Sequence, residues 1–122
     1  VASGNDGSTN SVSYPASHFN TLAVGATGAD NSIAPYSNQG SKLDLVAPGG
    51  NTSQDLDGDG YSDGVLQETQ VTSRGKTNWG YYFFQGTSMA SPHVAAAAAL
   101  QNLACRLLGI RLELSLLIRR LI

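Results

Sequence analysis

The sequence of 122 residues predicts an α/β fold, part of a doubly wound and mostly parallel sheet. Short apolar runs alternate with long loops rich in Gly, Ser, Thr and Asn, as in sheets whose loops carry function. Close to the C-terminal end, a β-favouring run leads into an alanine-rich helix. A chain of this length can form one core, but its strand and helix units amount to less than half of a doubly wound sheet. We therefore expect at most one domain, and only a portion of it.

The last strand and helix are predicted from residue type. Tyr81–Phe84 is an aromatic run typical of a buried strand, and residues 94–100 are mostly Ala, the best helix former. Ser88 lies between them near the helix N-terminus, and Pro92 fits an early helical turn. Unpaired backbone N–H groups and the positive end of the helix dipole would stabilise negative charge beside Ser88 Oγ. A serine in this position is also a common helix N-cap, so the junction alone leaves both roles open.

The ten residues 86–95 decide between a nucleophile and a simple N-cap at Ser88. Their sequence is Gly-Thr-Ser-Met-Ala-Ser-Pro-His-Val-Ala. They resemble the nucleophile motif of the subtilisin-like serine peptidases at every fixed position. They do not match the Gly-x-Ser-x-Gly elbow of α/β-hydrolases, because Ala90 stands where that motif requires a second Gly. The resemblance implies that Ser88 is the nucleophile of a serine endopeptidase that forms an acyl-enzyme with a polypeptide substrate.

The resemblance continues along the chain to about Leu100 and defines a first unit, residues 1–100. In the family's order, it covers a strand end with an asparagine, a Tyr-Pro-Ala turn, a central strand and two further segments: Val1–Asn5, Tyr14–Ala16, Leu22–Ala26, Tyr36–Asn38 and Leu45–Gly49. These segments imply a subtilisin-like sheet with the nucleophile at a helix N-terminus. The resemblance alone also implies an extracellular protein.

Asn5 follows Ser3-Gly4, a context in which Asn is also a common turn former. Beside the Ser88 motif, the resemblance implies that the Asn5 side chain donates an N–H to the oxyanion, together with a backbone N–H at Ser88. It also implies that the backbone of Ala2, Ser3 and Gly4 lines one wall of the pocket for the substrate residue before the scissile bond. The same comparison places Ser13 near the pocket floor, and the neighbouring Asp6 could favour a basic group at its rim.

A serine nucleophile needs a general base and a carboxylate that orients the base. The only histidines are His18 and His93. His93 lies five residues after Ser88, about 140° further round a helix, so we predict a packing and hydrogen-bonding role for it. His18 is predicted to be a solvated loop residue. In subtilisin-like enzymes the Asp and His precede the oxyanion asparagine, so we expect the missing N-terminal half of the domain to hold them. The isolated chain is then inactive.

A second chemical pattern, residues 55–64, spaces carboxylates as in an EF-hand calcium loop. Loop positions 1, 3, 5, 6, 7 and 9 are taken by Asp55, Asp57, Asp59, Gly60, Tyr61 and Asp63. Position 12 holds Leu66 in place of a bidentate Glu; starting at Asp57 would bring Glu68 there but put Ser62 at the glycine position. We expect a structural Ca²⁺ in an insertion of about residues 50–64, because four close carboxylates repel one another without a cation. A solvated Asp/Gly-rich loop is the alternative.

Charge and composition restrict the remaining function classes. The net charge is −2, which gives no indication of nucleic-acid binding, and a single cysteine, Cys105, excludes an internal disulfide. Residues 101–122 depart from the family. We expect either an altered reading frame or truncated end, or an amphipathic helix that packs on the sheet or on a partner; the stretch is too short and too charged to span a membrane. Two function classes remain open: a serine endopeptidase fragment, and a calcium-stabilised module or peptidase relative without activity.

Overall fold

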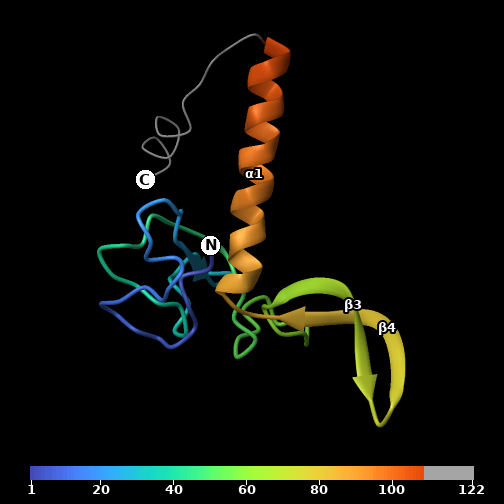
Figure 1. The fold of residues 1–122 in the computed structure, drawn as a ribbon. Helices are drawn as coiled ribbons and strands as arrows, with labels where there is room; N and C mark the ends of the chain where they lie inside the picture. Colours follow the sequence, from blue (N-terminus) through green and yellow to red (C-terminus); the bar gives the residue numbers. More distant parts are fainter. Residues whose placement is uncertain (109–122) are drawn as a thin grey trace.

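The computed structural model describes residues 1–108, which form two small sheets and one long helix (Figure 1). The elements in chain order are β1 (Val24–Thr27), β2 (Leu45–Pro48), β3 (Val65–Ser73), β4 (Lys76–Phe84) and α1 (Thr87–Leu108). Strands β1 and β2 pair in parallel, whereas β3 and β4 form an antiparallel hairpin. The predicted α/β class is confirmed.

Strand β1 is the centre of the parallel sheet, and all four of its residues are buried. On one side it pairs with β2, with Val24 opposite Leu45. On the other side Ala2 forms a parallel bridge to Val24, and Ser3 N donates to Val24 O over 2.9 Å. The N-terminal segment therefore extends the sheet, which fixes the position of the residues that follow it.

The two faces of this sheet are covered by different cores. Helix α1 packs its first turns on one face through Ala90 and Val94, which lie against Val24 and Ala26 of β1. A second cluster covers the other face and contains Val12, Ala16, Ala23 and Leu43. Because the residues facing the helix are small, the start of α1 lies close to the ends of β1 and β2.

Only the beginning of α1 is packed in this way. Ala90 is fully buried, whereas Leu100 and Leu107 are 68% and 77% exposed, and the helix projects from the body (Figure 1). The helix crosses the predicted boundary after residue 100 without interruption and continues to Leu108. The rest of the predicted tail, residues 109–122, lies outside the described part. Within residues 1–108, no helix is long and apolar enough to cross a membrane.

The β3–β4 hairpin corrects one prediction. Tyr81–Phe84 does lie in a strand, but this strand is not buried: Tyr81 is 68% and Phe83 is 36% exposed. The hairpin is a separate two-stranded sheet, and no further strand pairs with it within residues 1–108. Its turn residues Arg74 and Gly75 both have positive φ, at 50° and 74°, as a two-residue type I′ turn requires.

Candidate active site

Ser88 is the second residue of α1, directly after the hairpin. It is exposed, whereas its neighbours Gly86 and Thr87 are buried. Gly86 N donates to Gly49 O over 2.9 Å and also lies 3.0 Å from Tyr36 Oη. The chain is therefore tied to the body immediately before the helix begins, and Ser88 is presented to solvent from a fixed turn.

Tyr36 is the side chain that joins these segments. Its hydroxyl lies 2.9 Å from Gly49 O and 2.6 Å from Gly50 O, and it accepts from Gly86 N. Burial raises the pKa of Tyr36, whose phenol is protonated at neutral pH even at its ordinary pKa and is therefore a hydrogen-bond donor there. Gly49 cannot be replaced here, because a Cβ at this position would collide with Ala26 Cβ.

Asn5 lies beside this turn although it is 82 residues from Thr87 in sequence. Its Oδ1 accepts from both Thr87 N and Thr87 Oγ1, each over 2.9 Å. Thr87 Oγ1 in turn accepts from Gly4 N over 3.3 Å. Because the amide oxygen is fully occupied in this way, the Nδ2 end of the exposed Asn5 is the end left for an external acceptor.

The helix terminus supplies a second donor. The first N–H groups of a helix have no intrahelical acceptor, and Thr87 N is the one that Asn5 satisfies. Ser88 N is the next along, and no acidic residue in the first turn of α1 neutralises the positive end of the dipole. Ser88 N and the Nδ2 group of Asn5, whose Oδ1 is held by the preceding Thr87, are the kind of donors that can stabilise an oxyanion.

Neither histidine is arranged as a base for Ser88. His93 is exposed, and its Nδ1 donates back along the helix to Met89 O over 2.8 Å. His18 is an exposed loop residue whose Nδ1 accepts from Asn20 N over 3.2 Å. Within residues 1–108, the hydrogen bonds of both imidazoles therefore go to nearby backbone groups and not to Ser88.

Pro92 lies in an early turn of α1, as predicted. It is the sixth residue of α1, beyond the first turn. Its missing N–H therefore removes a helical hydrogen bond to Ser88 O, and this carbonyl is left without its usual partner four residues on. A proline in the first turn would not remove such a hydrogen bond, because the N–H groups there have no acceptor within the helix.

Three of the residues predicted to line the substrate pocket, Ser3, Gly4 and Ser13, contact Asn38, which is only 2% exposed. Ser3 Oγ donates to Asn38 O, and Asn38 Nδ2 donates to Ser13 Oγ, both over 3.0 Å. Asn38 Nδ2 also lies 3.1 Å from Asp6 Oδ2. Gly4 packs directly on Ser13 and Asn38, where a Cβ would not fit. Sequence reasoning missed Asn38 and Thr87 because their role depends on contacts between distant segments.

The predicted calcium loop is partly assembled. One carboxylate oxygen from each of Asp55, Asp57 and Asp59 lies within 4.8 Å of the others. Gly60 has a φ of +88°, the sharp turn expected of loop position 6. Asp63 is not part of this group, and its Oδ2 accepts from Leu56 N over 2.8 Å.

Tyr61, the predicted carbonyl donor, is held at the edge of the same loop. Its backbone N donates to Asp59 Oδ1 over 2.8 Å. Its ring is 65% exposed and lies on Phe83, with the ring centroids 5.9 Å apart. The loop is therefore in contact with the base of the hairpin.

Comparison with known proteins identifies the family. The sequence profile of the Subtilase family matches residues 1–104. The chain belongs to the subtilase family. Subtilisin BL of Lederbergia lenta is 45% identical over 100 residues, which cover 82% of this chain and 29% of that protein. Alkaline elastase YaB of Bacillus sp. (strain YaB) is 41% identical over 100 residues, which cover 82% of this chain and 21% of that protein.

Solved structures agree with this subtilase assignment. A protease of Pseudoalteromonas arctica PAMC 21717 has a TM-score of 0.69 at 38% identity, over 81% of this chain and 28% of that chain. A lanthipeptide protease has a TM-score of 0.64 at 34% identity, over 80% of this chain and 35% of that chain. The chain thus spans about a third or less of each of these four proteins.

Proposed function

We propose that the chain is the nucleophile-bearing part of a serine endopeptidase. Ser88 Oγ attacks the carbonyl carbon of a peptide bond, the amine leaves with a proton, and water then hydrolyses the ester formed at Ser88. The observation that carries this proposal is the orientation of Asn5, whose oxygen is held by Thr87 beside the helix terminus where Ser88 is exposed. Membership of the subtilase family supports it.

The general base and its orienting carboxylate are proposed to lie upstream of Val1. Two observations support this: neither His18 nor His93 is arranged to serve Ser88, and the chain spans 29% of Subtilisin BL. The partners are then a polypeptide substrate and the N-terminal half of the same domain. Residues Ala2, Ser3, Gly4 and Ser13 are proposed to line the pocket for the residue before the scissile bond. We further propose an extracellular location, by family membership alone.

Asn5→Ala in the domain completed with its upstream half is expected to lower kcat on the order of 10²–10³-fold with little change in KM. The magnitude is that of the corresponding subtilisin asparagine, a member of the same family. The amide donates only to charge that develops in the transition state, so its loss leaves ground-state binding intact. Steady-state kinetics on a peptide substrate measure both constants, and Asn20→Ala, which removes an exposed asparagine elsewhere, is the matched control.

A rise in KM at constant kcat in Asn5→Ala would show instead that Asn5 binds substrate or only shapes the turn. Thr87→Val gives an independent check. It removes the hydroxyl donor to Asn5 Oδ1 and keeps the backbone donor, so kcat should fall by less than in Asn5→Ala.

We also propose that the Asp55–Asp63 loop holds a structural Ca²⁺. The three clustered carboxylates fit this ion, because oxygens bound to one Ca²⁺ at 2.3–2.6 Å lie at most about 5 Å apart. Tyr61 O and Asp63 complete the proposed set. All three clustered side chains are exposed, so solvent weakens the repulsion between their carboxylates. A flexible set of oxygen ligands suits Ca²⁺ better than Mg²⁺, which requires a strict octahedron.

Calorimetric titration is expected to show Ca²⁺ binding at millimolar concentration or below, and weaker Mg²⁺ binding. The double variant Asp57→Ala with Asp59→Ala should lose the binding and the accompanying rise in Tm. Glu68→Ala is the matched control, because Glu68 is a ligand only if the loop starts at Asp57. Weakened binding in Glu68→Ala would favour that second register, and equal Tm values with and without Ca²⁺ in the unmodified chain would leave a solvated loop.

A further inference from the structure

One face of the β3–β4 hairpin carries a row of exposed aromatic side chains. Alternate residues of a strand point to the same face, so Trp79, Tyr81 and Phe83 of β4 lie in line. Leu66 is paired with Phe83, and the Tyr61 ring lies on Phe83, so both extend the row towards the hairpin base. We call this set, Tyr61, Leu66, Trp79, Tyr81 and Phe83, the aromatic face. Trp79 and Tyr81 are 71% and 68% exposed.

The hairpin is anchored close to Ser88. At its base, Gln85 Oε1 accepts from Thr52 N over 2.6 Å and from Thr52 Oγ1 over 2.8 Å. Gly86, which links β4 to α1, is tied to Gly49. Phe83 and Trp79 precede Ser88 by five and nine residues, and an extended chain spans at most about 3.6 Å per residue. The aromatic face therefore begins within about 18 Å of the Ser88 Cα and ends within about 32 Å of it.

We propose that the aromatic face is an accessory binding site for an extended, unfolded polypeptide substrate with apolar or aromatic side chains at alternate positions. This inference rests on the proposed peptidase function and names the form of its substrate. The side chains on one face of an extended polypeptide recur every ~7 Å, which is also the repeat of the aromatic row along β4. Each hairpin strand also has an open edge within residues 1–108, where a peptide backbone can pair.

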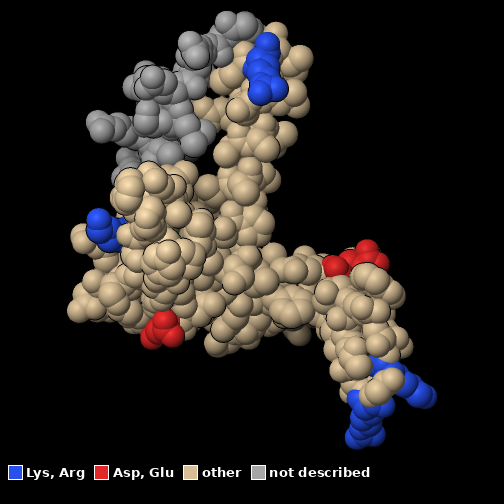
Figure 2. Space-filling view, in the orientation of Figure 1, with Lys and Arg blue, Asp and Glu red and all other residues tan. Residues whose placement is uncertain are grey.

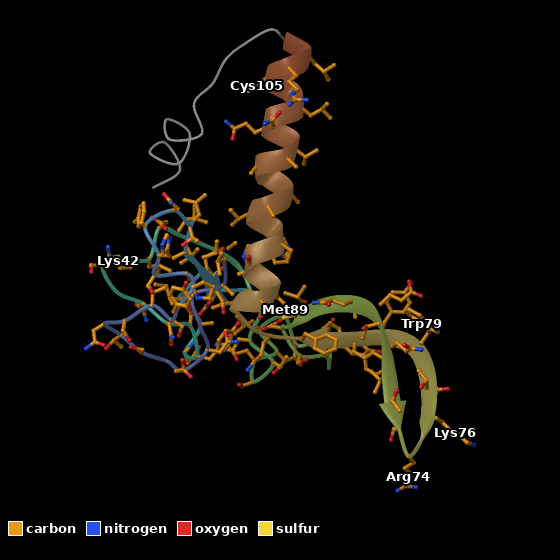
Figure 3. All side chains as sticks on the ribbon, in the orientation of Figure 1. Lys42, Arg74, Lys76, Trp79, Met89 and Cys105 are labelled. Carbon is orange, nitrogen blue, oxygen red and sulfur yellow. The ribbon has the colours of Figure 1, made fainter. Side chains whose placement is uncertain are left out.

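The charges favour a polypeptide over a lipid surface or nucleic acid. Arg74 and Lys76 are confined to the hairpin tip, as Figure 3 shows, where Trp79 is also labelled. Glu68, paired with Tyr81, lies in the middle of the aromatic face, and the loop at the base carries the Asp55, Asp57 and Asp59 carboxylates. Figure 2 shows that the basic side chains (blue) lie at the tip of the hairpin and that acidic side chains (red) lie further along it. Glu68 would therefore repel an anionic surface at the middle of the row.

Trp79 is the only tryptophan of the chain, so its fluorescence reports directly on this face. The probe is reduced and carboxymethylated ribonuclease A, an unfolded protein without tryptophan. Its addition to the full chain is expected to shift Trp79 emission to shorter wavelength in a saturable manner and to protect Trp79 from acrylamide quenching. Folded ribonuclease A should do neither.

Matched variants separate the two faces of the hairpin. Tyr81→Ala removes an aromatic ring next to Trp79 and should weaken binding of the unfolded probe about tenfold, as loss of an aromatic anchor does. Asn78→Ala, an exposed residue on the opposite face, should leave it unchanged. Circular dichroism of each variant should match that of the unmodified chain. In the domain completed with its upstream half, Tyr81→Ala should also lower the preference for the unfolded protein over a short peptide about tenfold.

No Trp79 response to the unfolded probe, or an equal response of both variants, would overturn the inference. A response to phosphatidylglycerol vesicles but not to the unfolded probe would overturn it in favour of a lipid-docking hairpin. The binding assay does not depend on catalysis and applies equally to Ser88→Ala. Failure of the accessory site therefore leaves labelling of Ser88 by a serine reagent intact, whereas failure of the peptidase proposal removes that labelling and leaves Trp79 binding.

Discussion

Residues 1–122 alone are expected to hydrolyse peptides on the order of 10⁴–10⁶-fold more slowly than the same residues joined to an upstream half that carries base and carboxylate. The described residues hold Ser88, Asn5 and the helix terminus, but the imidazoles of His18 and His93 are engaged elsewhere. Without a base, the Ser88 hydroxyl remains protonated and is a weak nucleophile. A fluorogenic peptide assay on the purified chain, with and without the upstream half, measures the difference.

Turnover by the isolated chain at the level of an intact serine peptidase, lost on Ser88→Ala, would contradict this expectation. His18→Ala and His93→Ala would then identify which imidazole acts as the base. If the isolated chain is inactive, both variants should leave the activity of the completed domain nearly unchanged, because both side chains are exposed and bonded locally.

Ser88→Ala in the completed domain is expected to reduce kcat on the order of 10⁶-fold. This is the loss found for the triad serine of subtilisin, from the same family. The residual rate comes from the oxyanion donors and substrate binding, which the substitution does not touch. Ser91→Ala is the matched control, since it removes a serine hydroxyl from the next turn of α1. A comparable loss in Ser91→Ala, or a loss of less than about tenfold in Ser88→Ala, would contradict the assignment.

The sequence predicted the parts of this site that are encoded locally. The decapeptide around Ser88 and the asparagine at position 5 could each be found by their neighbours, and the structure brings them to the same turn. What holds them there could not be found in this way. Thr87 belongs to the decapeptide and Asn38 to another matching segment, but the contacts of Thr87 with Asn5 and Gly4, and of Asn38 with Asp6, are seen only in the structure.

The hairpin shows a different limit of the sequence. Aromatic residues favour strands whether the strand is central or exposed, so Tyr81–Phe84 could not reveal that its sheet has only two strands within residues 1–108. The loop beside it was better encoded. Its Asp and Gly spacing predicted the positive φ of Gly60 and the meeting of three carboxylates, because these depend on residues within a few positions of one another. Asp63, the fourth predicted carboxylate, lies outside this group of three and accepts from Leu56 N.

Covalent labelling of the completed domain by a peptidyl phosphonate tests the central claim most directly, because the reagent bonds to an activated serine oxygen. Peptide mass mapping should place the adduct on Ser88 alone. Asn5→Ala should slow the labelling without moving it, and Ser88→Ala should abolish it. An adduct on another serine, or labelling that persists in Ser88→Ala, would show that Ser88 is not the nucleophile.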